Sequence, residues 1–386
     1  MNTETDVLII GGGILGCSAA YYLAREGVEV VLVERDDLNT QASGRNAGSL
    51  HVQLQSMFMR TESEANIRAR EKTLPLFMEG VRTWKQLAQE LDSDIELTVH
   101  GGLMVAETEE HMQFIRSKSE RERRCGIEVS ILGKSEVRAM APYLSERIIG
   151  AEFCPHEGKL NPTLAIPALA HAAERTGARI LRHVELMNIA PVAGGFVATT
   201  SRGAIRCRRV VNAAGAFATR IAAMAGFNLP ITFKCIQGTV SEPTAPVVKH
   251  LVYHAERILT FKQATSGNLI IGGGWPAMLD PVTNHPTVIR SSIESNMWVA
   301  MVIMPEVAHL RLLRAWAGVN LRTDGMPVLG EVPGLKGFYN IIPADAGLSL
   351  GPVCARLVAE LMCGRKPSFD IGRYSIERFS QAPAPA

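Results

Sequence analysis

The spacing of apolar and polar positions at the start of the chain predicts a strand–helix–strand unit. An apolar run over 7–10 leads into a glycine-rich turn, a helical segment over 14–26 and a second apolar run over 28–33 that ends in Glu34. Strands that are buried on both faces of a parallel sheet read as continuous apolar runs, and a helix returns the chain between them. We therefore expect a parallel βαβ unit here.

The next part of the chain predicts more helices and two further strands. Residues 62–91 carry apolar side chains at helical spacing, which predicts a helix. Two more helices are expected, over the heavily charged residues 107–125 and over residues 163–176. A short strand is expected over 179–181. The apolar run that begins at 208 and ends in small residues at 216 is typical of a buried strand.

The pattern changes to short alternating runs in the second half. Residues 231–280 contain runs such as LTFKQ and NLIIGGG, separated by turn signals such as Ser266-Gly267, and predict a series of strands. A last strand is expected over 338–342, followed by a loop and a helix over 352–362. The Ala/Pro-rich tail after 381 predicts no packed structure.

These elements predict a mixed α/β fold built from two interleaved domains. Segments typical of a Rossmann-like parallel sheet lie at both ends of the chain and near 210, with β-rich material between them. We expect the first domain to comprise residues 1–80, 145–220 and 320–386, and the β-rich second domain residues 81–144 and 221–319.

Three glycines in the first turn indicate a dinucleotide site. Gly11, Gly13 and Gly16 stand in G-x-G-x-x-G register. The first allows a tight turn, the second lets the backbone approach a pyrophosphate, and the third lets the helix pack on the sheet. The helix N-terminus attracts the phosphates, and Glu34 is placed to accept hydrogen bonds from a ribose diol. A lone motif of this kind can be an ordinary glycine-rich loop, but here the whole unit is present.

Composition and charge exclude several classes of partner. The 386 residues carry a formal net charge of +2 and are 47% hydrophobic, so neither nucleic acid nor an anionic membrane is expected as a partner. The uncharged stretch 7–24 is broken by glycines and follows acidic Glu4 and Asp6, unlike a signal peptide or a transmembrane segment. We expect a cytoplasmic protein, with any membrane association made through partners.

The cysteines give no metal or cluster pattern. The chain has seven of them, with no C-x-x-C pair and no cysteine–histidine cluster at metal-binding spacing. We expect reduced thiols, no metal site and no iron–sulfur cluster on this chain. Cys354 falls inside the last predicted helix.

Four segments in this order resemble the D-amino-acid oxidase-like flavoprotein superfamily, in particular its glycine oxidase and sarcosine oxidase branch. The first is the βαβ unit that ends in Glu34, and the second is the loop ASGRNAGSLHVQ from Ala42. The third is VNAAGA over 211–216. The fourth is the C-terminal set of WAG, TDGMPVLG and the AGLSLGP run that starts at Ala346.

The resemblance implies a Rossmann-like FAD-binding domain interleaved with a β-rich substrate domain, of the D-amino-acid oxidase/glutathione reductase-2 type. It implies FAD as cofactor and oxidation of a C–N bond by hydride transfer to the flavin N5. The residues expected at the cofactor are Gly11, Gly13, Ile14, Leu15, Gly16, Glu34, Arg35, Ser43, Gly44, Arg45, Asn46, Ala47, Gly48, Val184, Ala213, Ala214, Gly215, Gly347, Leu348 and Ser349.

Three departures from the family pattern affect the active site. Glycine oxidase has an arginine soon after Trp-Ala-Gly that holds the substrate carboxylate; here Asn320 matches it. Arg322, two residues on, is the expected clamp, with a structural surface arginine as the alternative. Monomeric sarcosine oxidase has a lysine that assists oxygen reduction, and the matching residue here is Ile270. That enzyme also tethers its flavin through a cysteine, whereas this chain has ADA over 344–346, so non-covalent FAD is expected.

Five residues are expected to act on or next to the substrate: Arg322, His51 just after the flavin loop, Tyr253, His254 and Asp345. Histidine and tyrosine can hydrogen-bond an amine or a carboxylate, although ordinary half-buried strand residues remain an alternative for 253 and 254.

Pocket walls are expected from Lys262, Trp275 and Trp316, with core packing as the alternative for each tryptophan.

The loop sequences look most like the flavin-bearing subunits of opine oxidase, D-hydroxyproline dehydrogenase and hydrogen cyanide synthase. This implies partner subunits that carry further electron carriers such as FMN or an iron–sulfur cluster. The expected reaction is oxidation of a small secondary amine that bears a carboxylate, such as an opine, a proline derivative or an N-alkyl amino acid. The alternative is an FAD-containing electron-transfer or structural subunit without its own turnover; an NAD-dependent dehydrogenase fits the flavin-type loops less well.

Overall fold

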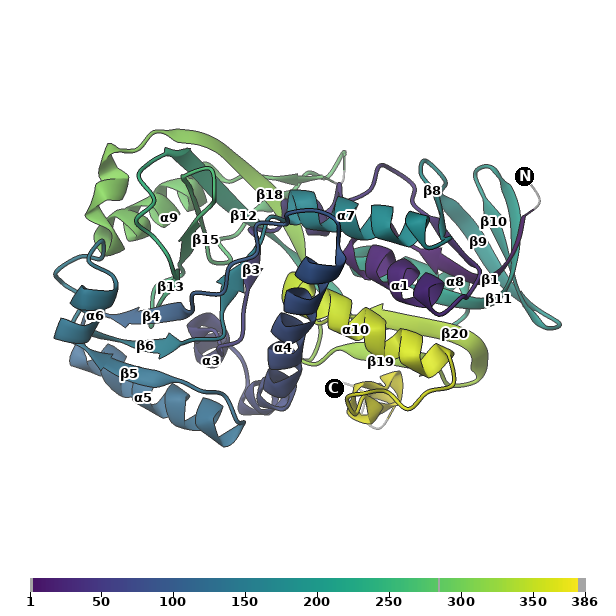
Figure 1. Cartoon of the computed structure of the whole chain (residues 1–386), viewed down its shortest axis with the longest axis horizontal. Coiled ribbons are helices and arrows are strands. Elements are labelled where there is room, and N and C mark those ends of the chain that lie inside the picture. The colour runs from purple at the N-terminus through teal and green to yellow at the C-terminus, as the bar shows by residue number, and fades with distance from the viewer. Residues whose placement is uncertain (1–2, 284, 381–386) are drawn as a thin grey trace.

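A parallel sheet forms one half of the molecule in the computed structural model, which describes residues 3–283 and 285–380 (Figure 1). Its strand order is β19-β20-β11-β1-β2-β8, with β9 and β10 extending it as a hairpin from β11. The pairs from β20 to β8 are parallel, and only β19 runs antiparallel along this path. The bounds are β1 (Thr3–Ile10), β2 (Val30–Val33), β8 (Arg179–Leu181), β9 (Leu186–Val192), β10 (Gly195–Thr200), β11 (Gly203–Asn212), β19 (Val328–Val332) and β20 (Leu335–Ile342).

The alternation of apolar side chains along β1 explains the layers around this sheet. Val7 and Ile9 face a core formed with α1 (Ile14–Arg25), α7 (Pro162–Arg175) and α10 (Gly347–Met362). Leu8 and Ile10 face the opposite core, which the β9–β10 hairpin helps to close. Both faces are thus buried, as the continuous apolar runs of the sequence predicted.

A second sheet forms the other half of the molecule, in the order β18-β12-β15-β14-β13-β4-β6-β5. Helix α9 (Arg290–Ile303) and α6 (Lys134–Met140) cover one face, and α5 (Glu109–Arg124) packs near the β4–β6 end of the other. The bounds are β4 (Gly102–Ala106), β5 (Ser130–Gly133), β6 (Gly150–Cys154), β12 (Thr232–Pro243), β13 (Leu251–His254), β14 (Thr260–Gln263), β15 (Asn268–Gly272) and β18 (Leu312–Arg322).

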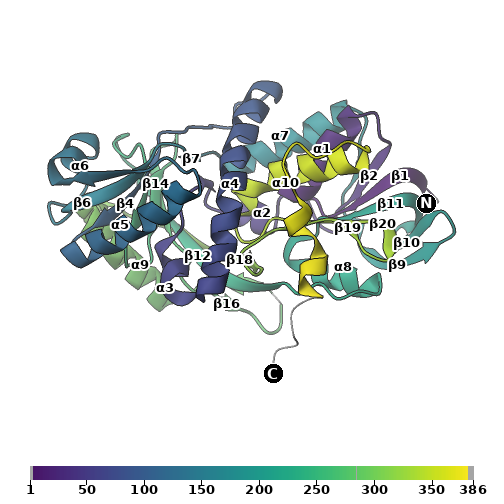
Figure 2. The same ribbon diagram turned by 90° about the horizontal axis from the view of Figure 1, so that it is seen from below.

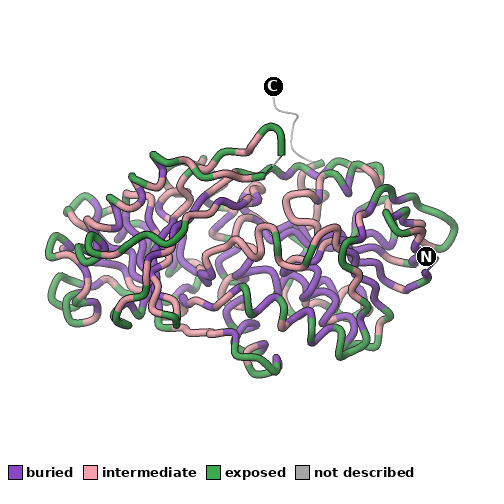
Figure 3. Tube along the Cα trace, turned by 90° about the horizontal axis from the view of Figure 1, so that it is seen from above, coloured by how far each residue is buried: buried purple, intermediate pink, exposed green. Residues whose placement is uncertain are grey.

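The long helix α4 (Glu64–Glu90) lies between the two sheets in both ribbon views (Figures 1 and 2). It contacts α10 on one side and α5 on the other. Figure 3 shows buried residues in both halves, with many of the exposed residues in the outer loops and turns. The remaining elements are short: α2 (Ala42–Arg45), β3 (Ser49–Leu50), α3 (Ser56–Thr61), β7 (Gly158–Lys159), η1 (Gly215–Phe217), α8 (Ala218–Met224), β16 (Met278–Leu279), β17 (Pro286–Thr287), η2 (Pro305–His309), η3 (Gly372–Tyr374) and η4 (Ile376–Phe379).

The structure confirms the mixed α/β fold class, and three of its differences from the expected elements concern helix α9, strand β6 and the start of helix α10. Helix α9 follows the predicted strands and was not predicted from the sequence. Strand β6 pairs with β4 and β5, so residues 150–154 join the second sheet although the expected boundary at 145 put them with the first. The domain division itself stays a prediction, and the tail after 381 lies outside the described residues.

The third difference is the start of α10, which begins at Gly347 rather than at Pro352. A proline inside a helix leaves the carbonyl four residues earlier without its hydrogen-bond donor. Here that carbonyl belongs to Leu348, and the indole Nε1 of Trp84 on α4 donates to it at 2.7 Å. A distant side chain therefore allows the helix to start more than one turn before its proline.

Within the described residues, no helix is both long enough and apolar enough to cross a membrane.

Replacing Trp84 by phenylalanine should destabilise the protein by about 1–3 kcal/mol, because the buried Leu348 carbonyl would lose its donor. Trp84 is 0% exposed. The matched control is Trp298→Phe on α9, where the side chain is 53% exposed and the expected change is below about 0.5 kcal/mol. Urea or thermal unfolding of the two variants measures the difference. Equal losses for both would contradict this account of the α10 start.

Candidate functional site

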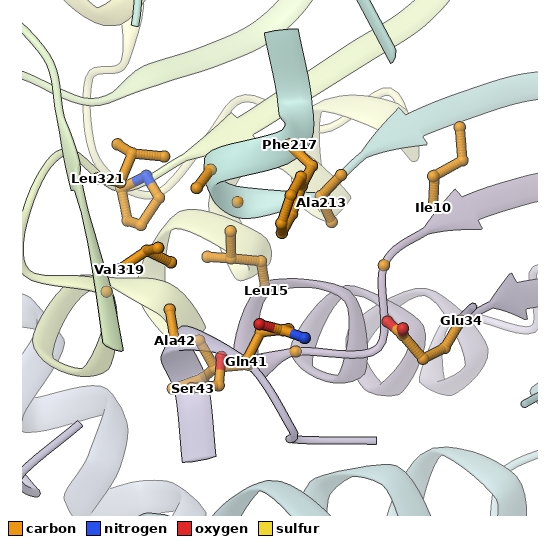
Figure 4. Close-up of a pocket in the computed structure, with 18 of the residues that line it drawn as sticks. Ile10, Leu15, Glu34, Gln41, Ala42, Ser43, Ala213, Phe217, Val319 and Leu321 are labelled. Atoms are coloured by element: carbon orange, nitrogen blue, oxygen red, sulfur yellow. Dashed lines mark hydrogen bonds between the residues drawn. The ribbon is translucent and has the colours of Figure 1, made fainter. Parts of the chain in front are cut away.

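A cavity opens where the carboxyl ends of β1, β2 and β11 meet the N-termini of α1 and α10 (Figure 4). This first cavity is lined along its length by the glycine turn, by the loop that contains α2, and by residues 318–321 of β18. Glu34 and Ile10 lie at one end in the close-up, and Val319 and Leu321 lie at the other. A crevice at the carboxyl ends of parallel strands is the usual ligand site of such sheets.

Close backbone contacts explain the glycines of the first turn. Gly11 has a φ of +110°, and a Cβ there would stand 2.7 Å from the carbonyl oxygen of Ala213. A Cβ on Gly16 would stand 1.9 Å from the carbonyl oxygen of Gly11. Any larger residue at either position would push β1, β11 and α1 apart.

The N-terminus of α1 offers free amides to the first cavity. The amide of Gly12 donates to Glu34 Oε2 at 2.6 Å, and the amide of Ile14 donates to Ser43 Oγ at 3.0 Å. Among the described residues, the amides of Gly13 and Leu15 have no hydrogen-bond partner. Unpaired amides at a helix N-terminus attract phosphate oxygens, so this turn fits the pyrophosphate of a dinucleotide.

Glu34 is held in place for a polar ligand. Its Oε1 accepts from the amide of Asp36 at 2.9 Å, which together with the bond to Gly12 fixes the carboxylate at the end of β2. Arg35 stacks on the ring of Phe217 at 4.2 Å, and both residues line the same end of the cavity. A carboxylate at the end of the second strand of a βαβ unit fits the ribose of an adenosine.

The loop over 42–48 joins the two halves of the molecule at the cavity. The indole Nε1 of Trp316 on β18 donates to the carbonyl of Arg45 at 2.7 Å, and Arg45 Nη1 donates to the carbonyl of Ala317 at 3.3 Å. Close contacts again require small residues, because a Cβ on Gly44 would lie 1.8 Å from Asn39 O and one on Gly48 2.3 Å from Leu160 O.

The structure brings most of the expected cofactor residues to the first cavity. Those that line it are Gly11, Gly13, Ile14, Leu15, Glu34, Arg35, Ser43, Arg45, Asn46, Val184, Ala213, Ala214, Gly215, Gly347 and Leu348. Gly16, Gly44 and Gly48 instead serve the close packing described above. Ala47 lines a neighbouring cavity, and Ser349 Oγ accepts the amide of His51 at 2.8 Å.

Sequence reasoning missed other lining residues: Gln41, Ala42, Phe217, Val319 and Leu321. Ala42 begins a motif that the sequence analysis singled out, and the other four lie within two residues of one, so the motifs indicated the segments but not all of the lining side chains.

Two of the expected substrate-side residues meet each other. The Nδ1 of His51 and the hydroxyl of Tyr253 are 2.7 Å apart, although 202 positions separate them in the sequence. Burial and the nearby Lys262 ammonium lower the pKa of His51 from 6.5 to about 3, so the ring is neutral at physiological pH. Burial and the neighbouring Glu157 carboxylate raise the pKa of Tyr253 well above 10.

His254, the next residue, lies apart from this pair. Its Nδ1 accepts from the amides of Glu256 and Arg257 at 3.0 and 2.9 Å and closes the turn after β13. The ring packs edge-on against His111 of α5 at a centroid distance of 5.0 Å. Burial lowers the pKa of His254 to about 4. These contacts fit the structural alternative for this residue, and a role at the substrate stays a prediction.

Arg322 and Asp345 meet in a buried ion-pair cluster with Glu62 and Arg70. Arg322 contacts Glu62 Oε1 at 3.1 Å and Asp345 Oδ2 at 3.4 Å. Arg70 contacts the same two carboxylates at 2.7 and 2.8 Å, and both guanidinium groups lie over the ring of Phe58. Asp345 lines the first cavity, whereas the guanidinium of Arg322 is already paired with two carboxylates. Its role as a substrate clamp stays a prediction.

A buried lysine stands directly opposite Ile270. The β14–β15 register pairs Lys262 with Ile270, so both side chains share one face of the sheet. Lys262 is 3% exposed, and its Nζ donates to Ser49 Oγ at 2.8 Å. It lines the second cavity, of about 580 Å³, together with Trp316 and Ala47. Trp275 donates to Ile258 O and packs against the core of the second sheet.

The cysteines are free thiols in the structure. Cys354 is fully buried inside α10, where burial raises the pKa of its thiol. Among the described residues, no group of three or more His, Cys, Asp or Glu side chains is arranged to hold a metal ion.

The parallel sheet, the glycine turn, the carboxylate at the end of β2 and the long cavity define a dinucleotide-binding α/β protein. A family described as FAD dependent oxidoreductase matches residues 6–361, and the chain belongs to this family. The expected superfamily, the FAD cofactor and the oxidoreductase class are thereby confirmed.

The relatives fall in the expected branch. The chain is 28% identical over 390 residues to glycine oxidase from Geobacillus kaustophilus, covering 98% of each chain. It is 26% identical to one of the subunits of opine oxidase from Rhizobium meliloti, covering 99% of each. The crystal structure of the Geobacillus glycine oxidase superposes with a TM-score of 0.85 at 26% identity and covers 97% of this chain and 99% of that one.

Replacing Gly13 by valine should prevent FAD binding. A Cβ on Gly13 would point at Ser43 Oγ, 2.8 Å away, and the larger side chain would fill the space beside the free amides of α1. The ratio of visible flavin absorbance to protein absorbance in the purified variant measures the loss, expected to exceed tenfold. Gly133→Ala is the control, because a Cβ there meets only Glu136 Oε2 at 3.6 Å. A fully yellow Gly13→Val protein would exclude this turn as the pyrophosphate site.

Replacing Lys262 by methionine should stabilise the protein more at pH 6 than at pH 10. Burial, with the nearby Lys159, lowers the pKa of Lys262 from 10.5 to about 7. Below pH 7 the folded protein carries the full cost of a buried ammonium. Between pH 7 and 10.5 the unfolded chain binds more protons than the folded one, so stability rises with pH until that cost is gone.

Urea unfolding at the two pH values measures this difference. The exposed Lys249→Met change is the control and should have the same small effect at both. A Lys262→Met effect that does not vary with pH would show that Lys262 is not held in the way the structure describes.

Proposed function

We propose that this protein oxidises the C–N bond of a small secondary amine or amino acid, by hydride transfer to the N5 of FAD. The observation that carries the proposal is the neutral His51–Tyr253 pair, whose His51 amide is held by Ser349, the residue after cavity-lining Leu348. The chain that carries this pair resembles glycine oxidase and an opine oxidase component. When bound, FAD supplies the two-electron acceptor of the reaction.

The protein's own residues prepare the amine and the electron acceptor. Hydride leaves most readily from carbon when the adjacent nitrogen has a free lone pair, and burial lowers the pKa of an amine towards that neutral form. Val319, Leu321 and Leu348 line the cavity, and their apolar side chains offer no hydrogen-bonding partners to water there. The backbone amides at the start of α10, around Gly347 and Leu348, favour negative charge beside them.

We further propose that the chain works as the catalytic subunit of a heteromeric dehydrogenase. Two similarities support this assembly: the one to the opine oxidase component and, at 26% identity, the one to the beta chain of sarcosine oxidase from Rhodobacter capsulatus. Partner subunits would then carry further electron carriers. The second candidate is an electron-transfer or structural flavoprotein, which the expected FAD site alone would also satisfy.

Anaerobic mixing of the purified yellow protein with secondary amino acids and opines tests the proposal. Bleaching of the visible flavin absorbance by one of them within seconds to minutes is the expected result, and it names the substrate class. The rate at which air restores the colour then separates an oxidase from a dehydrogenase. An FAD-loaded chain that no amine bleaches, alone or after addition of its partner subunits, would favour the electron-transfer role instead.

A further inference from the structure

A chain of buried hydrogen bonds runs from α5 to His51, and donor-only groups fix its direction. It starts at Lys118, whose ammonium contacts the carboxylates of Glu122 and Glu152; all three side chains are 0% exposed. The third bond of Lys118 Nζ goes to Gln53 Oε1 at 3.2 Å. An ammonium can only donate, so the Gln53 amide must turn its oxygen towards Lys118 and its NH₂ group the other way.

The Gln53 amide in turn fixes the role of Glu157. Gln53 Nε2 donates to Glu157 Oε2 at 3.0 Å, and the backbone amides of Val52 and Gln53 donate to Glu157 Oε1 at 2.7 and 2.9 Å. All three groups can only donate. Glu157 also hydrogen-bonds the hydroxyl of Tyr253, and this hydroxyl is the one group in the set that can either donate or accept. Burial raises the pKa of Glu157, and the hydrogen bonds from the Val52 and Gln53 amides and from Tyr253 oppose that rise by stabilising the carboxylate. Surrounded by donors, the carboxylate accepts from Tyr253 as well.

The direction of the Tyr253 hydroxyl decides the tautomer of His51. Since Tyr253 has one proton and donates it to Glu157, its oxygen must accept from His51 Nδ1 across the 2.7 Å contact. The proton of the neutral ring therefore sits on Nδ1, and Nε2 keeps a free lone pair. Within the described chain Nε2 has no hydrogen-bond partner, and it is not among the solvent-inaccessible polar atoms.

The backbone of His51 is tied to the wall of the first cavity. The His51 amide is anchored to Ser349 Oγ, and the adjacent Leu348 lines the cavity. On its other side, His51 directly follows β3, where Ser49 receives the Lys262 ammonium.

We propose that Glu157, through Tyr253, holds His51 in the tautomer whose bare Nε2 accepts a hydrogen bond from the N–H of the substrate amine. His51 is then the group that contacts the substrate, and Glu157 is a positioning residue. An atom that only accepts is repelled by a carboxylate, so the amine end of an amino acid faces His51 and the acid end faces elsewhere. This inference rests on the proposed oxidation of an amine.

The Glu157→Gln variant tests the direction of the chain. A glutamine at 157 can keep its oxygen on the Val52 and Gln53 amides, and its NH₂ group then faces both the Tyr253 hydroxyl and Gln53 Nε2, whose hydrogen bond is lost. The hydroxyl must then donate to His51 Nδ1, which moves the ring proton to Nε2. Nitrogen NMR of the FAD-loaded protein, selectively labelled at histidine, reports the tautomer without any substrate. The His51 signals are assigned by their absence in His51→Asn.

We expect a protonated Nδ1 and a bare Nε2 in the wild type, the reversed pair in Glu157→Gln, and a mixture in Tyr253→Phe. With the amine that bleaches the flavin fastest in the panel above, KM should rise about ten- to a hundredfold in Glu157→Gln, as expected for a lost bond to a charged or polar N–H.

Glu122→Gln is the matched control. It also replaces a buried carboxylate that holds this segment, because Glu122 Oε1 accepts from the amide of Leu54 at 2.6 Å, but it does not contact Tyr253. We expect it to lower the unfolding midpoint without changing the His51 tautomer or KM.

The outcomes separate this inference from the proposed function. If an amine bleaches the flavin but the His51 tautomer and KM are the same in wild type, Glu157→Gln and Tyr253→Phe, the positioning role is wrong. The same holds if Glu122→Gln reproduces the Glu157→Gln changes. If the tautomers behave as described but no amine bleaches the flavin, the hydrogen-bond chain stands and both the proposed amine oxidation and the amine contact of His51 fail.

Discussion

The backbone of residues 51–54 crosses from the FAD-binding loop to the second sheet without belonging to either large sheet. Its amides therefore depend on side chains: Ser349 Oγ receives His51, Glu157 receives Val52 and Gln53, and Glu122 receives Leu54. Two of these acceptors are carboxylates that are 0% exposed. Burying an ionised carboxylate is costly unless its oxygens are hydrogen-bonded, and here burial raises the pKa of both groups. The backbone amides supply part of the bonds that oppose this cost, although Glu122 Oε2 has no hydrogen-bond partner among the described residues. The amides of this segment thus need the two carboxylates, and the carboxylates need these amides.

This dependence links the two halves of the molecule at the site. The carboxylates come from α5 and from the turn between β6 and β7, the serine comes from α10, and the segment itself continues the loop over 42–48. A shift of the second sheet would move His51 and Ser49 relative to α10 and to the glycine turn. Trp84 adds a second link, because its bond to Leu348 O ties α4, which lies between the sheets, to the start of α10. The geometry of the cavity is therefore a property of both halves together.

The parts of the site that could be predicted from sequence are those whose contacts are local. Gly11, Gly16 and Glu34 belong to one βαβ unit, and their spacing alone implies the turn, the helix packing and the carboxylate at the strand end. Position along the chain could not reveal that Arg322 would meet Glu62, or that a lysine would stand across from Ile270 on the adjacent strand. Those contacts depend on strand register and on helix placement, which a single sequence does not encode locally. The start of α10 shows the same limit. Pro352 alone predicts a later start, and the earlier start depends on the hydrogen bond from distant Trp84 to Leu348 O.

The electrostatics around the cavity combine two solutions to the cost of buried charge. Arg70, Arg322, Glu62 and Asp345 neutralise one another, so this cluster holds α4, β18 and the turn before α10 together without placing net charge on the site. Lys262 has no carboxylate partner among the described residues, and burial lowers the pKa of its ammonium to about 7 instead. His51 follows the same route and remains neutral. The ion pairs, the neutral His51 and the lowered pKa of Lys262 all reduce the net charge of these buried groups. Such surroundings favour the uncharged form of an amine, which is the form from which a hydride can leave.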